Sequence, residues 1–263
     1  MLLTGNKTLR QIAGLAETCN FLFLKLLLKN RAKARQFPGE IFRSYMGLVR
    51  DERWACRSIF ELFPQAAGNR VVLEHIPCEG LLTPLEQLAC LALITKCLQP
   101  RAIFEIGTYR GRTALNFALN SPKDCTIHTL DLPPGMRLGD DLRQNSADRD
   151  LIRASSPGAC YEGKDVAYKI EQLYGDSKTF DFAPYRRSVD IVYVDAAHDY
   201  EAVCSDSENA LAMVRANGCV IWDEFANYGE YNDVTRGIQD VVGVENIVHV
   251  ENTQLAVYFQ PAD

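Results

Sequence analysis

An apolar run that turns through two glycines into a helix constrains the fold of this chain more than any other feature. Residues 103–106 are Ile-Phe-Glu-Ile, Gly107 and Gly111 follow, and residues 113–119 continue as a helical stretch. A strand that turns through glycines into a helix N-terminus lets backbone N–H groups approach a ligand closely. Doubly wound α/β domains hold nucleotide-like cofactors in this way, at the carboxyl ends of their strands. The alternative is a strand–turn–helix with a purely structural role.

The spacing of the glycines separates two classes of cofactor site. A dinucleotide fingerprint would need glycine at positions 109 and 112, where this chain has Tyr109 and Arg112. The pattern E-x-G-x-x-x-G instead resembles motif I of class I S-adenosyl-L-methionine (SAM)-dependent methyltransferases. That resemblance implies a set of cofactor-binding residues in and around the turn: Glu105, Gly107, Thr108, Tyr109, Gly111 and Thr113.

An acidic residue at the end of the next apolar run supports this interpretation. Asp131 follows the run 125–130 and lies twenty-four residues beyond Gly107. An acid at the end of the second strand can accept hydrogen bonds from both ribose hydroxyls of a cofactor. The alternative for Asp131 is a turn or helix-capping aspartate before Pro133.

The order of helical and apolar segments predicts the fold class. Thr83 as N-cap opens a helix that ends near Leu98. Strands then alternate with helices: strand 102–106, helix 112–120, strand 125–131, strand 169–174, strand 189–195, helix 200–216 and strand 219–223. Residues 246–250 and 255–259 form two β runs with a short connection, which predicts an antiparallel hairpin. We therefore expect an α/β fold with a doubly wound, mostly parallel, seven-stranded sheet that the C-terminal hairpin closes. Class I methyltransferases, which are Rossmann-like, have this hairpin, and dinucleotide-binding Rossmann domains lack it.

Two regions lie outside this alternation. Residues 1–80 are predicted to be a helical extension, and residues 81–263 the SAM-binding domain. Apolar residues recur at helical spacing from 12 to 26, before a basic run. This amphipathic helix packs on the domain or on a second copy in a homo-oligomer, or else lies on a membrane surface. The long connection 132–168 is typical of a lid or binding loop, with a helix near 142–154.

Charge and cysteine usage exclude some partners and compartments. The 263 residues carry a net charge of −6, which gives no support for binding nucleic acid. The nine cysteines contain no C-x-x-C pair, which is typical of free thiols in a reducing cytoplasm.

A glycine with small polar residues follows the predicted strand 169–174. Gly175, Asp176 and Ser177 resemble the methyltransferase loop that contacts adenine, with Phe180 or Phe182 near the ring. The Asp176 carboxylate or the Ser177 hydroxyl would then bond the exocyclic amine. An ordinary Gly-Asp-Ser turn is equally consistent with the pattern.

Three carboxylates end the next two predicted strands. Asp195 ends one strand, and Asp223 and Glu224 end the following one. Carboxyl ends of adjacent parallel strands lie roughly 5 Å apart, so these side chains can converge on one cation. Carboxylates without a thiolate favour a hard ion such as Mg²⁺. Alternatively, the acids only cap the strand ends.

Over about residues 80–260 the chain resembles the catechol and caffeoyl-CoA O-methyltransferases, and more loosely the macrocin-type sugar O-methyltransferases. In the catechol-type enzymes the two aspartates and the next residue bind Mg²⁺, and this chain has Glu224 where they have asparagine. The resemblance implies Asp195 as a cofactor-binding, catalytic and metal residue. It also places His198 where those enzymes have a lysine as general base.

These observations predict an enzyme that transfers a methyl group from SAM to a hydroxyl of a small molecule or sugar, either with the assistance of magnesium or without it. Tyr228 and Tyr231 would line the acceptor side, and Trp222 either joins them or lies in the core. One alternative is a non-catalytic SAM-fold binding or scaffold protein. A less favoured alternative is an NAD(P)-dependent oxidoreductase, which would need a third close glycine and no terminal hairpin.

Overall fold

The computed structural model describes residues 54–76, 83–134, 156–226 and 232–262. The chain divides into two units, residues 1–49 and 50–263, and all described residues belong to the second. The predicted amphipathic helix at 12–26 and the predicted helix at 142–154 therefore lie outside the described residues.

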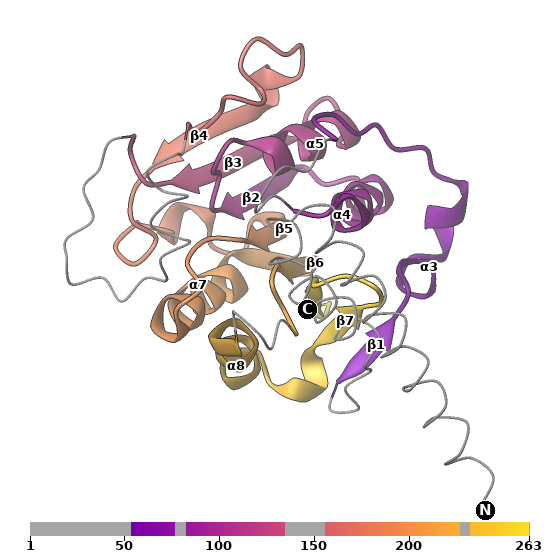
Figure 1. Ribbon diagram of the computed structural model, residues 1–263, viewed down its shortest axis with the longest axis vertical. Helices are drawn as coiled ribbons and strands as arrows, with labels where there is room; N and C mark the ends of the chain where they lie inside the picture. Colours follow the sequence, from indigo (N-terminus) through magenta and orange to yellow (C-terminus); the bar gives the residue numbers. More distant parts are fainter. Residues whose placement is uncertain (1–53, 77–82, 135–155, 227–231, 263) are drawn as a thin grey trace, which may run out of the picture. The chain divides into compact units, whose positions relative to one another are not determined.

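A single mixed sheet forms the centre of the described region (Figure 1). Its strands lie in the spatial order β1-β7-β8-β6-β5-β2-β3-β4. In chain order they are β1 (Ala55–Arg57), β2 (Ala102–Ile106), β3 (Thr126–Asp131), β4 (Ile170–Tyr174), β5 (Val189–Val194), β6 (Val214–Trp222), β7 (Val248–Val250) and β8 (Ala256–Phe259). All pairs are parallel except those of β8, which is antiparallel to β6 and to β7. The predicted fold class and the C-terminal hairpin are confirmed.

The sheet has eight strands where the sequence predicted seven. The additional strand is β1, which pairs in parallel with β7 at one edge of the sheet. It lies in the region predicted to be helical and separate, so residues near 55 are part of the sheet. Three residues are too few to show a period-two pattern, which explains why the sequence did not reveal the strand.

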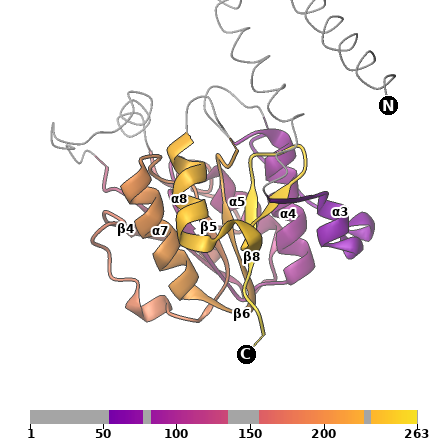
Figure 2. The same ribbon diagram turned by 90° about the horizontal axis from the view of Figure 1, so that it is seen from below.

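Helices cover both faces of the sheet (Figure 2). On one face lie α4 (Leu85–Leu98) and α5 (Arg112–Asn120), and on the other lie α7 (Tyr200–Met213) and α8 (Asn232–Val242). Shorter helices are α3 (Ile59–Leu62), η1 (Pro64–Gly68), η2 (Ala167–Lys169), η3 (Ala183–Tyr185) and η4 (Val244–Asn246). No helix among these described elements is long and apolar enough to cross a membrane.

Alternate residues of each central strand belong to different hydrophobic cores. Ile103 of β2 and Ile191 of β5 pack in the core beneath α4 and α5. Phe104 and Val192, one residue further along, pack in the core beneath α7 and α8. Because side chains alternate across a strand, a strand buried on both faces is apolar throughout. This burial accounts for the continuous apolar runs in the sequence.

Side chains cap the starts of α3 and α7, whereas α4 begins without a side-chain cap. The Asp199 side chain accepts a hydrogen bond from Ala202 N–H at 3.0 Å and caps α7. Thr83 was predicted to cap α4, but Pro84 occupies the N-cap position and makes no side-chain cap. The Thr83 carbonyl instead accepts a hydrogen bond from the Arg112 guanidinium, 2.5 Å away. Thr83 therefore contacts a residue distant in the chain and does not act as the cap of α4.

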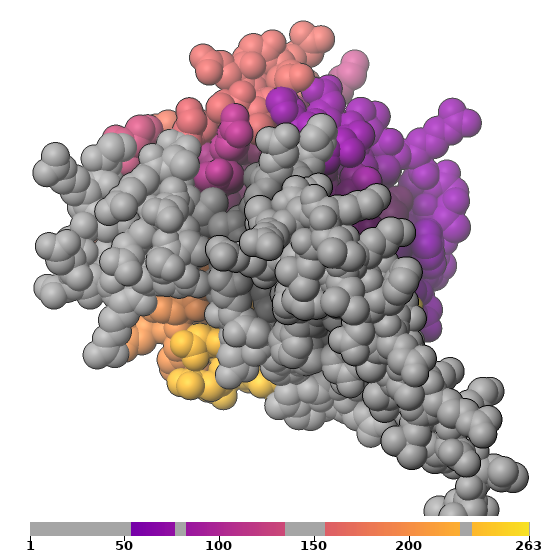
Figure 3. Space-filling model, viewed as in Figure 1, coloured from indigo at the N-terminus to yellow at the C-terminus, as the bar shows by residue number. Residues whose placement is uncertain are grey.

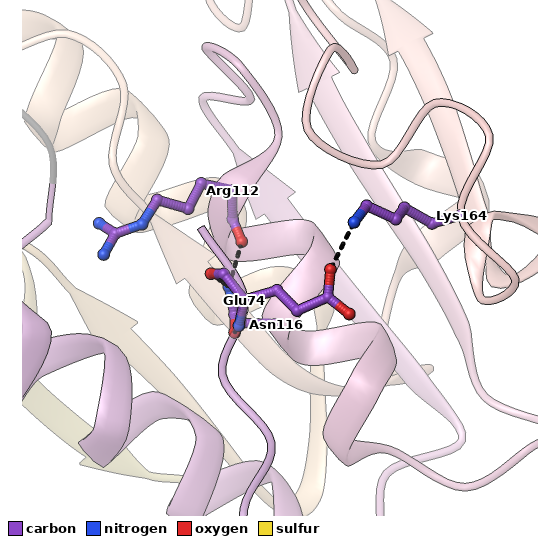
Figure 4. A network of polar contacts seen from close by, with 4 residues as sticks. All are labelled: Glu74, Arg112, Asn116 and Lys164. Carbon is purple, nitrogen blue, oxygen red and sulfur yellow. Dashed lines mark hydrogen bonds and ion pairs between the residues drawn. The ribbon is translucent and has the colours of Figure 1, made fainter. Parts of the chain in front are cut away.

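An extended segment, residues 72–76, lies along α5. Side chains from one face of α5 hold this segment through hydrogen bonds to its backbone. The Asn120 amide bonds both backbone polar groups of Val72, at 2.9 and 2.8 Å. The Asn116 amide does the same for Glu74, at 3.0 and 3.1 Å. Four residues of helix and two of extended chain both advance about 6 Å, so the two spacings match. Figure 4 shows Asn116 between Glu74 and the carbonyl of Arg112.

The same segment is joined to the loop before β4 by an ion pair. Lys164 Nζ lies 2.5 Å from Glu74 Oε2, and both side chains are more than a third exposed (Figure 4). Pairs as exposed as this one contribute little to stability. The bonds from the buried side chains of α5, which are those of the two asparagines and those of Arg112 to His75 O and Ile76 O, are therefore the main attachment of the segment.

We expect Asn116→Ala to lower the free energy of unfolding by about 2 kcal/mol, because it leaves the Glu74 N–H and C=O without partners. Urea denaturation followed by circular dichroism measures the change. Glu74→Gln, which removes only the ion pair, should cost less than about 1 kcal/mol. Equal losses for the two variants would contradict this assignment.

The opposite edge of the sheet is formed by β4. Its outer side carries no further described strand, and Tyr174 is 49% exposed there. In the space-filling view this part of the chain, in salmon, forms the upper border of the molecule (Figure 3). Strands β3 and β2, which lead to Asp131 and to the glycine turn, lie inward of this edge.

Candidate functional site

The glycine turn after β2 is pressed against the end of β5. Gly107 N–H donates to Leu130 O at 2.9 Å, and Asp195 N–H donates to Ile106 O at 2.9 Å. Gly107 has φ +103°, and a Cβ built on it would lie 1.9 Å from the carbonyl oxygen of Asp195. Only glycine fits this position. The turn therefore lies where strand order reverses between β2 and β5, which is the ligand-binding point of open α/β sheets.

Asp131 faces this turn. Its Oδ2 accepts a hydrogen bond from Tyr109 N–H at 2.6 Å, and its Oδ1 accepts one from Leu132 N–H at 2.7 Å. Burial raises the pKa of Asp131, and these backbone donors partly offset the effect. Each carboxylate oxygen has a second lone pair. The carboxylate is thus held beside the glycine turn and can still accept bonds from a ligand.

A buried polar network lies beneath the turn. Thr129 donates to Glu105 and lies 2.7 Å from the Thr108 hydroxyl. Gln172 Nε2 donates to Thr108 Oγ1 at 3.1 Å, and Gln172 Oε1 accepts from Tyr161 OH at 2.6 Å. The Glu105 and Thr108 side chains are therefore engaged inside the protein, so only backbone atoms of Thr108 are presented at the turn. Burial raises the pKa of Glu105 well above its usual range.

The ring of Tyr161 also fixes Gly111. A Cβ on Gly111, which has φ +77°, would lie 2.4 Å from a ring carbon of Tyr161. Gly111 occupies the N-cap position of α5, and Thr113 in the first turn is buried. The sequence analysis did not identify Tyr161, because the loop that carries it has no periodic pattern.

The predicted adenine loop follows β4. Lys178 N–H donates to Asp176 Oδ1 at 3.0 Å, and Phe180 N–H donates to Asp176 O at 2.8 Å. Phe180 packs under Gly175, with a ring carbon 3.0 Å from where a Cβ would lie. Phe182 is buried in the core against Phe104. Ser177 is partly exposed and Asp176 is exposed, so both are accessible at this loop.

The carboxylates of Asp195 and Asp223 are bridged by a phenol. Tyr193 OH lies 2.9 Å from Asp223 Oδ2 and 3.2 Å from Asp195 Oδ2. Gln87 of α4 donates to Asp223 Oδ1 at 2.8 Å and accepts from Gln254 N–H at 2.5 Å. The sequence analysis missed Gln87 and Tyr193. Tyr193 has one weak sequence signal, since it lies two residues before Asp195 and so on the same face of the strand.

His198 acts electrostatically on both aspartates. Burial, and then the charge of Asp223, raise the pKa of Asp195, while the charge of His198 lowers it. Burial also raises the pKa of Asp223, and hydrogen bonds and His198 lower it. His198 is thus close enough to both predicted carboxylates for its charge to act on them. Glu224 adds to the rise in the Asp195 pKa and has φ +55°.

The predicted three-carboxylate magnesium site does not fit this arrangement. In the described part of the chain, no three side chains of His, Cys, Asp or Glu are placed to hold one metal ion. Asp223 Oδ1 already accepts two hydrogen bonds, from Gln87 and from Glu224 N–H, which use both of its lone pairs, and Oδ2 accepts one from Tyr193. We therefore derive no step through a metal.

Three aromatic residues were predicted at the side of the site where the methyl acceptor would bind, and the structure describes one of them. Tyr228 and Tyr231 lie outside the described residues. Trp222 is 1% exposed, and its Nε1 donates to Ser207 Oγ at 3.0 Å. Trp222 is therefore a core residue.

The described cysteines make no disulfide. Cys56, Cys90, Cys97, Cys125, Cys160, Cys204 and Cys219 are free thiols. Burial raises the pKa of Cys125 to about 11 and that of Cys219 to about 12. These thiols are therefore protonated at neutral pH and take no part in the site.

Comparisons with known proteins agree with this fold. Residues 104–225 match the model of a family described as a methyltransferase domain. The O-methyltransferase TomG from Streptomyces achromogenes, solved with SAM, has a TM-score of 0.50 at 16% identity, over 81% of this chain and 99% of that one. The methyltransferase PaMTH1 from Podospora anserina, solved with SAH, has a TM-score of 0.53 at 14% identity, over 86% of this chain and 96% of that one. No curated protein matches this sequence significantly. At these identities the two structures establish the fold alone, and the predicted class I methyltransferase fold is confirmed.

Proposed function

We propose that this protein methylates a hydroxyl oxygen of a small molecule or sugar. The premise is the match of residues 104–225 to a methyltransferase domain, in a chain with the class I SAM-dependent methyltransferase fold. The observation that carries the proposal is the contact between Asp131 and Tyr109 N–H. Through this contact the carboxylate that would accept hydrogen bonds from the ribose lies beside the glycine turn, at the same point of the sheet.

The residues at the strand tips fit SAM. Gly107 leaves no room for a side chain beside Asp195, so backbone atoms alone face the ligand at the turn. Asp131 would accept from the ribose hydroxyls, and Ser177 would lie against the adenine. SAM supplies an electrophilic methyl group, so the protein has to position it and to supply a nucleophilic oxygen.

An acceptor hydroxyl must lose its proton, and His198 is the base we assign to this step. Imidazole has an ordinary pKa near 6.5, so it is largely neutral and able to accept a proton at neutral pH. The carboxylates of Asp195 and Asp223 lie close enough to interact with its charge. Burial raises the pKa of Asp195 to about 8, so we assign to Asp223, which accepts three hydrogen bonds, the negative charge that stabilises the imidazolium. Tyr193 and Gln87 hold Asp223 in place for this role.

The first test is isothermal titration calorimetry with S-adenosylhomocysteine (SAH) and with NAD(P)H. Binding of SAH but not of NAD(P)H supports the proposal and excludes the oxidoreductase. Transfer of labelled methyl from SAM to phenols and sugars then separates an enzyme from a non-catalytic scaffold. The absence of SAH binding would refute the proposed function.

We expect His198→Ala to lower kcat by about 100-fold and to change the SAH affinity by less than about threefold. The change removes the base but none of the groups assigned to cofactor binding. Initial rates with labelled SAM and calorimetry with SAH measure the two effects.

His198→Lys is the matched control for that variant. Lysine restores a base with a higher pKa, so the rate should rise only at more alkaline pH than in the wild type. A His198→Ala variant with the wild-type kcat would remove His198 from the mechanism.

A further inference from the structure

The loop that precedes β4 packs against the glycine turn. Cys160 N–H donates to Arg110 O at 2.8 Å. The ring of Tyr161, which is 8% exposed, occupies the space that a Cβ on Gly111 or on Gly158 would need. Both glycines have a positive φ, +77° and +90°, so neither position suits a residue with a side chain. The loop and the C-terminal end of the turn are therefore packed together.

The hydroxyl of Tyr161 reaches the other end of the turn through Gln172 of β4. It donates to Gln172 Oε1 at 2.6 Å, and Gln172 Nε2 donates to Thr108 Oγ1 at 3.1 Å. Gln172 Nε2 also lies 3.1 Å from Thr129 O and 3.0 Å from Leu173 O. Backbone carbonyls only accept hydrogen bonds, so the amide nitrogen must face them and the amide oxygen must face the phenol. The orientation of the Gln172 amide is therefore determined by its neighbours.

Thr108 lies directly before the backbone group that meets Asp131. The N–H of the next residue, Tyr109, donates to Asp131 Oδ2 at 2.6 Å. Tyr109 has φ +49°, which is sterically unfavourable for a residue with a side chain, so this part of the turn needs support from other residues. The Thr108 hydroxyl provides it, since it accepts from Gln172 and lies 2.7 Å from the Thr129 hydroxyl. The hydrogen bonds of Thr108 therefore support the contact between the turn and Asp131.

We propose that Tyr161 is a positioning residue for the cofactor, which holds the glycine turn in the conformation that binds SAM. The inference rests on the proposed function, because it takes the glycine turn as the cofactor site. The ring of Tyr161 holds the turn at Gly111. Its hydroxyl holds the turn at Thr108, through Gln172. A turn that is held at both ends loses less conformational freedom when a ligand binds, and such preorganisation increases affinity.

The first experiment measures SAH affinity on variants of this link. Calorimetry gives the Kd of SAH for the wild type, Tyr161→Phe, Gln172→Met and the double variant, well below their unfolding temperatures. Tyr161→Phe keeps the ring against Gly111 and removes only the hydroxyl, whereas Gln172→Met removes all hydrogen bonds of the amide. We expect each single variant to weaken SAH binding by at least about fivefold, because the Thr108 end of the turn loses support. Since both changes cut the same link, the double variant should bind SAH about as weakly as Gln172→Met alone.

Tyr168→Phe is the matched control for the loss of a phenol hydroxyl. Tyr168 also lies before β4, but it is 70% exposed, and its hydroxyl donates to Lys123 O at 3.3 Å. Its SAH affinity should stay within about twofold of the wild type. A purely structural role of Tyr161 would lower the unfolding temperature of Tyr161→Phe and leave its Kd unchanged, which would overturn the inference. Additive losses in the double variant would overturn the link through Gln172.

The second experiment uses the reciprocity of coupling, since a loop that stabilises the binding conformation of the turn is itself stabilised by the ligand. We expect SAH to slow amide hydrogen exchange in residues 158–162 by at least about threefold in the wild type, and by less in Gln172→Met. Equal slowing in the two proteins, or none in the wild type, would contradict the inference. Tyr161→Phe is the smaller change, so it decides both measurements if Gln172→Met does not fold.

Two failures are distinguishable. A wild type that binds no SAH would refute the proposed function, and the inference with it. A wild type that binds SAH, together with a Tyr161→Phe variant that binds it equally tightly, would overturn the inference alone.

Discussion

Gly107→Ala should yield a protein that is unfolded or only marginally folded at 25 °C. An added Cβ would lie 1.9 Å from the carbonyl oxygen and 2.6 Å from the carbonyl carbon of Asp195. Both are backbone atoms of a residue whose N–H is bonded to Ile106 O, so they cannot move without breaking the contact between β2 and β5. The positive φ of +103° adds strain for any residue with a side chain. We expect a loss above about 4 kcal/mol, which is a large share of the stability of a typical domain.

Gly68→Ala is the matched control for this variant. A Cβ at Gly68 meets no atom within 4 Å, so the same chemical change should alter the free energy of unfolding by less than about 1 kcal/mol. Urea titrations of the two variants followed by circular dichroism give the comparison. Similar stability for Gly107→Ala and Gly68→Ala would show that the turn is not packed as described.

Asp131→Ala should weaken SAH binding by about 1,000-fold. The carboxylate would bond two ribose hydroxyls, and a hydrogen bond to a charged group contributes about 1.5–3 kcal/mol. The substitution also removes the partner of Tyr109 N–H, so the glycine turn loses one of its supports. The two effects act on the same ligand, and both lower its affinity.

Calorimetry with SAH measures this loss, and thermal unfolding checks the fold. The control is Asp181→Ala, because Asp181 also accepts a bond from a nearby backbone N–H, that of Ala183 at 3.0 Å, but is exposed. Its SAH affinity should stay within about threefold of the wild type. If Asp131→Ala binds SAH as tightly as Asp181→Ala, then Asp131 is only a turn residue.

The features that the sequence predicted are those that depend on neighbouring residues. The glycine turn, α5 and the two-sided burial of the strands follow from glycine spacing and apolar periodicity. Asp131 was found because the end of a strand is visible in the sequence. The capping of α4 was predicted wrongly, since its outcome depends on Arg112, which lies on another helix.

The partners of the Asp195 and Asp223 carboxylates are residues distant in the chain, and the sequence did not reveal them. Gln87 contacts Asp223, 136 positions away, and Gln254, 167 positions away. The spacing of Asp195 and Asp223 correctly placed both at neighbouring strand ends. It gave no sign that Tyr193 and Gln87 would occupy the Asp223 oxygens, which is why a metal site was expected there.

The position of β8 has a consequence for how the chain acquires its structure during synthesis. Strand β8 follows both of its partners in the chain, yet it lies in the interior of the sheet, between β7 and β6. Until it emerges, β6 has an open, apolar edge of the kind that invites pairing with other chains. The protein is therefore most exposed to misassembly before β8 pairs with β6, and a variant truncated before Ala256 would remain in that state.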